Sequence, residues 1–165
     1  YVDMIIHAFE PFVNSNSEIL ILGSFPSVKS REENFYYGNK LNRFWKTLAE
    51  IYGEKICETV EEKKCFLTRH KIALWDVVTS CEIVGSLDAN IKNPTVCDMT
   101  QIFKVANVNK ILINGGTAKK LFKKAYPLLN KICFYLPSTS PANVRFDFKQ
   151  WKKALLATPP TANKF

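Results

Sequence analysis

The chain has 165 residues, of which 47% are hydrophobic, and it carries a formal net charge of +8 with a pI of about 9.3. This length predicts one compact domain over residues 1–165 and excludes a second. No apolar run reaches the roughly 18 residues of a membrane span, and the first residues lack a signal-peptide pattern, so we expect a soluble, cytoplasmic protein. The positive charge favours a polyanionic partner such as DNA or RNA without establishing one.

Four short apolar runs predict buried strands of a parallel sheet, and helical patterns separate them. The strands are expected at Ser17–Leu22, Ile72–Val78, Lys110–Ile113 and Ile132–Leu136. The helices are expected at Asn42–Ile51, Thr59–Thr68, Asp98–Val105, Thr117–Ala125 and Phe148–Ala157. Thr59 and Glu62 have the spacing of a capping box, which supports the second helix. The alternation predicts an α/β fold in which helices cover both faces of a parallel sheet.

The loop after the first predicted strand combines a glycine, hydroxyls, amides and aromatic rings. In parallel sheets, ligands bind at the carboxyl ends of the strands, where this loop begins. Its glycine lets backbone approach a ligand, and Phe25 or Tyr36 offers a face on which a base can stack. Phe44 and Trp45 are expected instead on the buried side of the next helix. The candidate residues of this loop are Gly23, Ser24, Phe25, Ser27, Lys29, Tyr36 and Asn39.

The loop after the last predicted strand reads LPSTSPAN, from Leu136 to Asn143. Two prolines limit its flexibility, while three hydroxyls and the backbone amides can grip successive phosphates. An ordinary Pro/Ser surface turn is the alternative. The candidate DNA contacts here are Ser138, Thr139, Ser140, Pro141, Asn143 and Arg145.

A third loop, Asn114-Gly115-Gly116-Thr117, lies between a predicted strand and a lysine-rich helix. Its glycines do not have the spacing of a known phosphate-binding fingerprint. Asn114 ends the strand, where its amide is well placed to read the edge of a base. Capping of the following helix by Thr117 is the alternative use of this loop. The lysines of that helix are either an ordinary solvated face or a phosphate-binding surface.

The remaining chemistry-bearing residues suggest no other familiar site. The five cysteines are odd in number and form no CxxC pair, so we expect reduced thiols, no metal and no cofactor. Asp76 and Asp88 lie near predicted strand ends or turns, where each either acts as a base or orients a loop.

Five segments together resemble one enzyme family. They are ILILGSFPSVKS, FYYGNKLNRFW, ALWDVV, ILINGG and LPSTSPAN. Their order and spacing are similar to those of the hypoxanthine-DNA (deoxyinosine) glycosylase branch of the uracil-DNA glycosylase superfamily. The resemblance implies a three-layer α/β/α sandwich with a central four-stranded parallel sheet and a DNA-binding groove across the strand ends. It also implies a metal-independent, monofunctional enzyme that flips a deaminated base out of DNA and hydrolyses its N-glycosidic bond.

The chain differs from the pattern of the wider superfamily at one position. Related families place a polar residue that activates the hydrolytic water where this chain has Phe25. Phe25 cannot activate water, and in the deoxyinosine branch the matching amide is the asparagine of YYGN, here Asn39. We therefore expect Asn39 to position water, with Asn42 as the alternative, while groups near Gly23 and Asn114 stabilise the departing base.

The expected substrate is hypoxanthine in DNA, duplex or single-stranded, with uracil and xanthine as further possibilities, and the expected state is a monomer. A mismatch-type uracil-DNA glycosylase is the nearest rival, because pocket preference rests on one or two hydrogen bonds. A non-catalytic DNA-binding relative and a hydrolase of free nucleosides are rivals from other classes.

Overall fold

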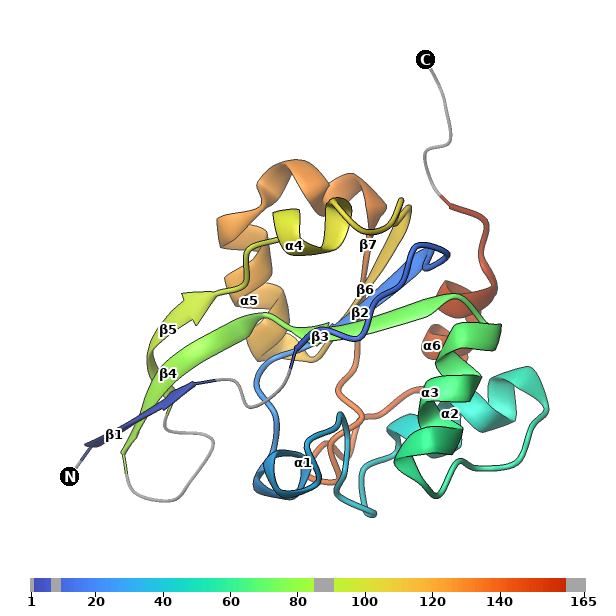
Figure 1. Cartoon of the computed structure of the whole chain (residues 1–165), viewed down its shortest axis with the longest axis horizontal. Helices are drawn as coiled ribbons and strands as arrows, with labels where there is room; N and C mark the ends of the chain where they lie inside the picture. Colours follow the sequence, from blue (N-terminus) through green and yellow to red (C-terminus); the bar gives the residue numbers. More distant parts are fainter. Residues whose placement is uncertain (1, 7–9, 85–90, 160–165) are drawn as a thin grey trace.

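A parallel sheet of four strands lies at the centre of the structure (Figure 1). The structure is a computed structural model, and it describes residues 2–6, 10–84 and 91–159. The strands are β2 (Ile19–Gly23), β3 (Ile72–Asp76), β6 (Lys110–Asn114) and β7 (Cys133–Leu136), in the order β3-β2-β6-β7. Every neighbouring pair is parallel, and all residues of β3 and β6 are buried. The predicted central sheet is therefore confirmed.

Helices cover both faces of this sheet, as predicted, with α4 and α5 on one side and α2, α3 and α6 on the other (Figure 1). Thr59 caps α3 through the predicted capping box with Glu62. Gly115, and not Thr117, precedes α5, and it makes no side-chain cap. The helices are α1 (Val28–Glu33), α2 (Phe44–Tyr52), α3 (Val60–Arg69), α4 (Thr100–Phe103), α5 (Gly116–Ala125) and α6 (Phe148–Leu156), with a 3-10 helix at Pro127–Ile132.

Aromatic side chains fill the space between the sheet and the helices on the α2 and α6 side. The buried rings of Phe44, Trp45 and Trp151 meet edge to face, with Phe44 5.0 Å from Trp45 and 6.1 Å from Trp151 between ring centroids. Phe44 and Trp45 thus lie on the buried side of α2, as predicted. Lys110 is also buried, and its ammonium donates to the carbonyls of Leu155 and Ala157, which fixes the end of α6 against the sheet.

A second sheet was not predicted. It is antiparallel, with β4 (Val78–Val84) between β1 (Val2–Ile6) and β5 (Ile91–Val96). The single strand predicted over Ile72–Val78 is wrong, because β3 ends at Asp76 and the chain turns into β4. The Val77 and Val78 amides donate to the carbonyls of Gly23 and Ser24, and these bonds mark the change of direction. A continuous apolar run carries no sign of such a switch between sheets.

The structure shortens one predicted helix and does not describe one predicted site residue. The helix predicted over Asp98–Val105 is a single turn, α4. Asp88 lies outside the described residues. Within the described part of the chain, no helix is both long enough and apolar enough to cross a membrane.

Candidate active site

A cavity of about 310 Å³ opens at the carboxyl ends of the parallel strands. The loops after β2, β6 and β7 meet there, together with the last residue of β3, as the rule for parallel sheets predicts. Most of the predicted site residues line this cavity: Gly23, Ser24, Phe25, Ser27, Tyr36, Asn39, Asn114, Ser138, Thr139, Ser140 and Pro141. Asn42, Tyr37 and Asp76 line it as well.

Gly23 lies in close contact with two other residues of the cavity lining. A Cβ atom at this position would lie 2.6 Å from Asp76 Oδ1 and 2.9 Å from the Tyr37 hydroxyl oxygen. Glycine is thus required here for close approach, and Asp76 and Tyr37 present their oxygens to the same spot. Asp76 is 3% exposed, so its carboxylate forms part of the buried floor of the cavity.

The position of Tyr37 is fixed by its backbone conformation, by a ring contact and by a hydrogen bond. Its backbone has a positive φ of 56°, and its ring stacks on Phe44 with 3.8 Å between centroids. The Asn114 amide donates to its hydroxyl oxygen at 3.2 Å. Burial raises the pKa of the Tyr37 hydroxyl well above its ordinary value, and the Asp76 carboxylate adds to this shift. Tyr37 therefore remains a protonated hydroxyl at neutral pH and can donate a hydrogen bond.

Asn114 was expected to read a base, and that role stays a prediction; in the structure its amide group joins two walls of the cavity. It donates to Thr139 Oγ1 at 3.0 Å and to the Tyr37 hydroxyl, and it accepts from the Thr139 backbone amide at 3.0 Å. Both of its N–H hydrogens are thus used, and one lone pair of its oxygen remains. Asn114 is 8% exposed, so these bonds are shielded from water and fix the loop after β7.

Asn39 is a half-buried residue of the cavity lining and begins a tight turn, in which its carbonyl accepts from the Asn42 amide. Its side-chain oxygen accepts from the Leu41 backbone amide at 2.9 Å, which sets the orientation of the amide group. The oxygen keeps a second lone pair, and among the described residues the two N–H hydrogens have no acceptor. The neighbouring Asn42 accepts from the Phe44 amide at the start of α2, so its oxygen supports the helix.

Arg43 ties the Asn39 loop to the loop after β7. Its backbone amide donates to the Thr139 carbonyl at 3.0 Å, and its guanidinium donates to the carbonyls of Ser140 and Asn143 at 2.9 and 3.1 Å. The guanidinium also lies 5.3 Å from the centroid of the Phe146 ring. Sequence reasoning gave Arg43 no role, because its partners lie about a hundred residues away along the chain.

The hydroxyl loop after β7 is stiffened by its own side chains. The Ser138 hydroxyl accepts from the Ser140 amide, the Ser140 hydroxyl accepts from the Ala142 amide, and Asn143 accepts from the Arg145 amide. Thr139 is 1% exposed and its polar groups are bonded within the protein, so it anchors the loop. Asn143 and Arg145 line a shallower depression beside the cavity, and Arg145 is exposed.

The aromatic residues of the first loop differ in how much of each ring is accessible. Phe25 is partly exposed, and the Arg31 guanidinium lies 5.6 Å from its ring centroid. Tyr36 is 2% exposed and its hydroxyl donates to the Glu10 carbonyl, so it belongs to the core. Of the two rings proposed for base stacking, Phe25 is the one with accessible surface.

The two predicted DNA contacts near α1 differ in their position relative to the cavity, and their contact with DNA stays a prediction. Ser27 caps α1 by accepting from the Ser30 amide at 3.2 Å. Lys29 does not line the cavity; its side chain is 67% exposed, and its ammonium lies 3.7 Å from Glu32.

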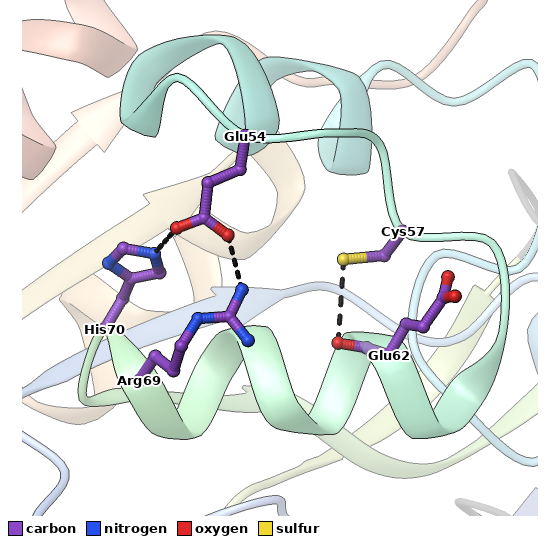
Figure 2. Close-up of polar contacts among 5 residues, drawn as sticks. All are labelled: Glu54, Cys57, Glu62, Arg69 and His70. Carbon is purple, nitrogen blue, oxygen red and sulfur yellow. Dashed lines mark hydrogen bonds and ion pairs between the residues drawn. The ribbon is translucent and has the colours of Figure 1, made fainter.

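A separate polar cluster joins the end of α2 to the end of α3 (Figure 2). His70 and Arg69 both bond to the Glu54 carboxylate, with 2.6 Å between His70 Nε2 and Glu54 Oε2. These bonds lower the pKa of Glu54, that to His70 most. His70 also stacks on Tyr52, with 3.9 Å between ring centroids. This cluster connects the two helices and does not line the cavity.

Among the described residues, no group of three or more His, Cys, Asp or Glu side chains could hold a metal ion, and the five cysteines are free thiols.

Comparison with known proteins places this architecture in one family. The model of the uracil DNA glycosylase superfamily matches residues 10–158. A protein from Methanosarcina acetivorans, named hypoxanthine DNA glycosylase, is 36% identical over 149 residues, which cover 87% of this chain and 92% of the relative. A protein of the same name from Methanosarcina barkeri is 36% identical over 109 residues, which cover 65% of this chain and 69% of the relative.

The fold agrees with this relationship. The solution NMR structure of a proposed uracil DNA glycosylase from Methanosarcina acetivorans is similar to this chain, with a TM-score of 0.79 and 30% sequence identity. The match covers 92% of this chain and 97% of that one. The chain therefore belongs to the uracil DNA glycosylase superfamily.

Proposed function

We propose that this protein is a monofunctional DNA glycosylase that excises a deaminated base, with hypoxanthine preferred, by hydrolysing the N-glycosidic bond. The observation that carries the proposal is the cavity at the strand ends, whose lining includes the buried Asp76 carboxylate and the protonated Tyr37 hydroxyl, both close to Gly23. The names of the two Methanosarcina relatives support the preference for hypoxanthine. The substrate is DNA, and a base must leave the stack to enter a cavity of this kind.

Asp76 and Tyr37 supply hydrogen bonds that distinguish a deaminated base from the amino base it replaces. Deamination turns the amino group beside a ring nitrogen into a carbonyl beside an N–H, so hypoxanthine, xanthine and uracil all present an acceptor next to a donor. Adenine and cytosine present the opposite order. A buried carboxylate accepts from the ring N–H, and a hydroxyl donates to the carbonyl, so the pair fits the deaminated edge.

Tyr37 also stabilises the departing base. Negative charge develops on the base as its bond to the sugar breaks, and a fixed donor in a shielded site stabilises such charge more than water does. The Asn114 amide donates to the Tyr37 oxygen, so the Tyr37 hydroxyl keeps its own hydrogen to donate to a base. Asn114 acts on the base through Tyr37 and through the loop after β7.

Asn39 positions the water that attacks the sugar. Its oxygen is oriented by the Leu41 amide and keeps a lone pair that can accept from water. A neutral amide orients water but is a poor base, so stabilisation of the leaving group supplies most of the rate. Asn42 is the weaker candidate, because its oxygen already supports α2.

Surface residues around the cavity bind the DNA strand. Stacking of the flipped base on Phe25 contributes about 1 to 3 kcal/mol by analogy with base–aromatic stacking, which offsets part of the cost of flipping. The exposed Pro141 and Arg145, with Ser138, Ser140 and Asn143, border the cavity where the DNA backbone would pass. The enzyme acts as a monomer inside the cell, where its DNA substrate lies.

The test is an alkaline-cleavage assay on labelled duplexes that carry one deoxyinosine, deoxyxanthosine, deoxyuridine or, as control, an undamaged deoxyadenosine. The proposal predicts cleavage that is fastest at deoxyinosine and absent at deoxyadenosine. Fastest cleavage at deoxyuridine would favour the mismatch-type uracil enzyme. Binding without any cleavage would favour a non-catalytic relative, and hydrolysis of free deoxyinosine alone would favour a nucleoside hydrolase.

A further inference from the structure

A second cavity, of about 760 Å³, lies beside the proposed base-binding cavity. It separates the segment that carries Asn39 from the segment that leads into α3. Tyr37, Asn39 and Asn42 line both cavities, so the two share a wall. Its volume is within the range of pockets that hold small-molecule ligands. Nothing in the proposed excision of a base uses this second cavity.

Lys63 on α3 is the unusual residue of this cavity. It lines the cavity, yet the residue as a whole is only 6% exposed. Its ammonium lies 5.3 Å from the centroid of the Trp45 ring, and no oxygen of the described residues accepts a hydrogen bond or ion pair from it. Burial lowers the pKa of Lys63, and Glu33 and Cys57 oppose this shift from farther away. The ammonium thus faces the cavity with donors that the described residues do not use, and an anion bound in the cavity would accept from them.

The other residues around the cavity favour an anion that carries an organic group. Its cationic members outnumber its two carboxylates, Glu33 and Glu58. Leu41 and Ile56, which are 74% and 51% exposed, add apolar surface at its edge. A phosphate attached to a sugar combines these two properties. The cations are Lys40, Arg43, Lys46 and Lys63.

We propose that this cavity binds a phosphate of the lesion-bearing DNA strand, beside the flipped nucleotide, and that the Lys63 ammonium is its main contact. The proposal rests on the proposed function, because it needs DNA in the neighbouring cavity. A free phosphate or mononucleotide offers the same chemistry. The shared wall favours the DNA strand, since the backbone of a strand whose base lies in the first cavity would lie near the residues that line both cavities.

The test is a scan of single phosphates by neutral methylphosphonate substitution. The duplex carries a tetrahydrofuran abasic site, which has no glycosidic bond to cut, and the dissociation constant is measured for the wild-type protein, Lys63→Met and Lys64→Met. Lys64 is the matched control, because it is the next residue of α3, is exposed and does not line the cavity. We expect one position beside the abasic site where substitution weakens wild-type binding roughly tenfold, the size of one charge-assisted hydrogen bond.

On the unmodified duplex, Lys63→Met should bind about tenfold more weakly than the wild type. Neutralising the contacted phosphate should not weaken Lys63→Met further, whereas Lys64→Met should respond to each substitution as the wild type does. The salt dependence of binding should fall by about 0.9 in logarithmic slope for the lost phosphate contact. A melting curve separates binding from folding, because removing a buried charge should leave the melting temperature unchanged or raise it. An identical scan for the wild type and Lys63→Met would overturn the proposal.

Two further measurements separate this proposal from its alternatives. The first measurement adds inorganic phosphate to the free protein and follows the Lys63 side-chain resonances by NMR. If these resonances shift and no phosphate in the DNA scan depends on Lys63, the site belongs to a free anion and the DNA proposal is overturned. Lack of excision on every lesion duplex would contradict the proposed function alone. The scan uses uncleavable DNA, so its result at Lys63 would still stand.

Discussion

Replacement of Asn114 by alanine tests whether its amide group holds the cavity together. The variant loses three hydrogen bonds of 3.0 to 3.2 Å and leaves the Thr139 backbone amide without an acceptor in a site that is 1% exposed. One unsatisfied buried donor costs roughly 1 to 3 kcal/mol, and the lost side-chain bonds add to this. We expect Asn114→Ala to lower the free energy of unfolding by about 2 to 4 kcal/mol.

Urea denaturation followed by circular dichroism measures this loss, with Asn130→Ala as control. Asn130 is exposed, and its side chain accepts from the Tyr135 hydroxyl at the surface, so its replacement should change stability by less than about 0.5 kcal/mol. A double-mutant cycle with Thr139→Val should give a coupling of about 1 kcal/mol, because both variants remove the same bond to Thr139 Oγ1. A loss below 1 kcal/mol for Asn114→Ala, or no coupling, would refute this account of the loop.

Three other changes test the site and its surroundings. Gly23→Ala should reduce excision severely while the protein stays folded, because the new Cβ would lie 2.6 Å from Asp76 Oδ1; single-turnover kinetics and a melting curve measure the two effects. Asp76→Asn should weaken discrimination between deoxyinosine and deoxyadenosine, because an amide can donate where the carboxylate only accepts; competition between the two duplexes measures the ratio. The folded-state pKa of Glu54 is depressed below 4.5, so its contribution is present above that pH and is lost as the pH falls through the folded value. Glu54→Gln should therefore be less stable than the wild type at pH 7, and the difference should shrink in urea titrations below about pH 4.5.

The central sheet could be predicted from sequence because its strands are short apolar runs with helices between them. Such strands are buried on both faces, so hydrophobicity alone marks them. The second sheet could not be predicted in this way. Val78 continues the apolar run of β3, and only the bonds from Val77 and Val78 back to the β2 loop reveal that the chain has left the first sheet.

The location of the site could be predicted from the sequence, but the hydrogen-bonding role of each residue in it could not. Parallel strands bring their carboxyl ends together, so the loops after β2, β6 and β7 were expected to meet, and they do. The individual bonds depend on contacts between distant segments. Asn114 donates to Thr139 and Tyr37, and Arg43 donates to a carbonyl in the loop after β7. No local sequence pattern indicates either set of contacts.

The most direct test of the proposed reaction compares Asn39→Ala with Asn42→Ala on a duplex that carries one deoxyinosine. Single-turnover excision rates and the dissociation constant for an abasic-site duplex are measured for both variants and the wild type. The account predicts excision by the wild type, a loss of roughly 100-fold or more in Asn39→Ala with DNA affinity retained, and a smaller loss in Asn42→Ala. An unchanged rate in Asn39→Ala, or no excision of hypoxanthine by the wild type, would contradict it.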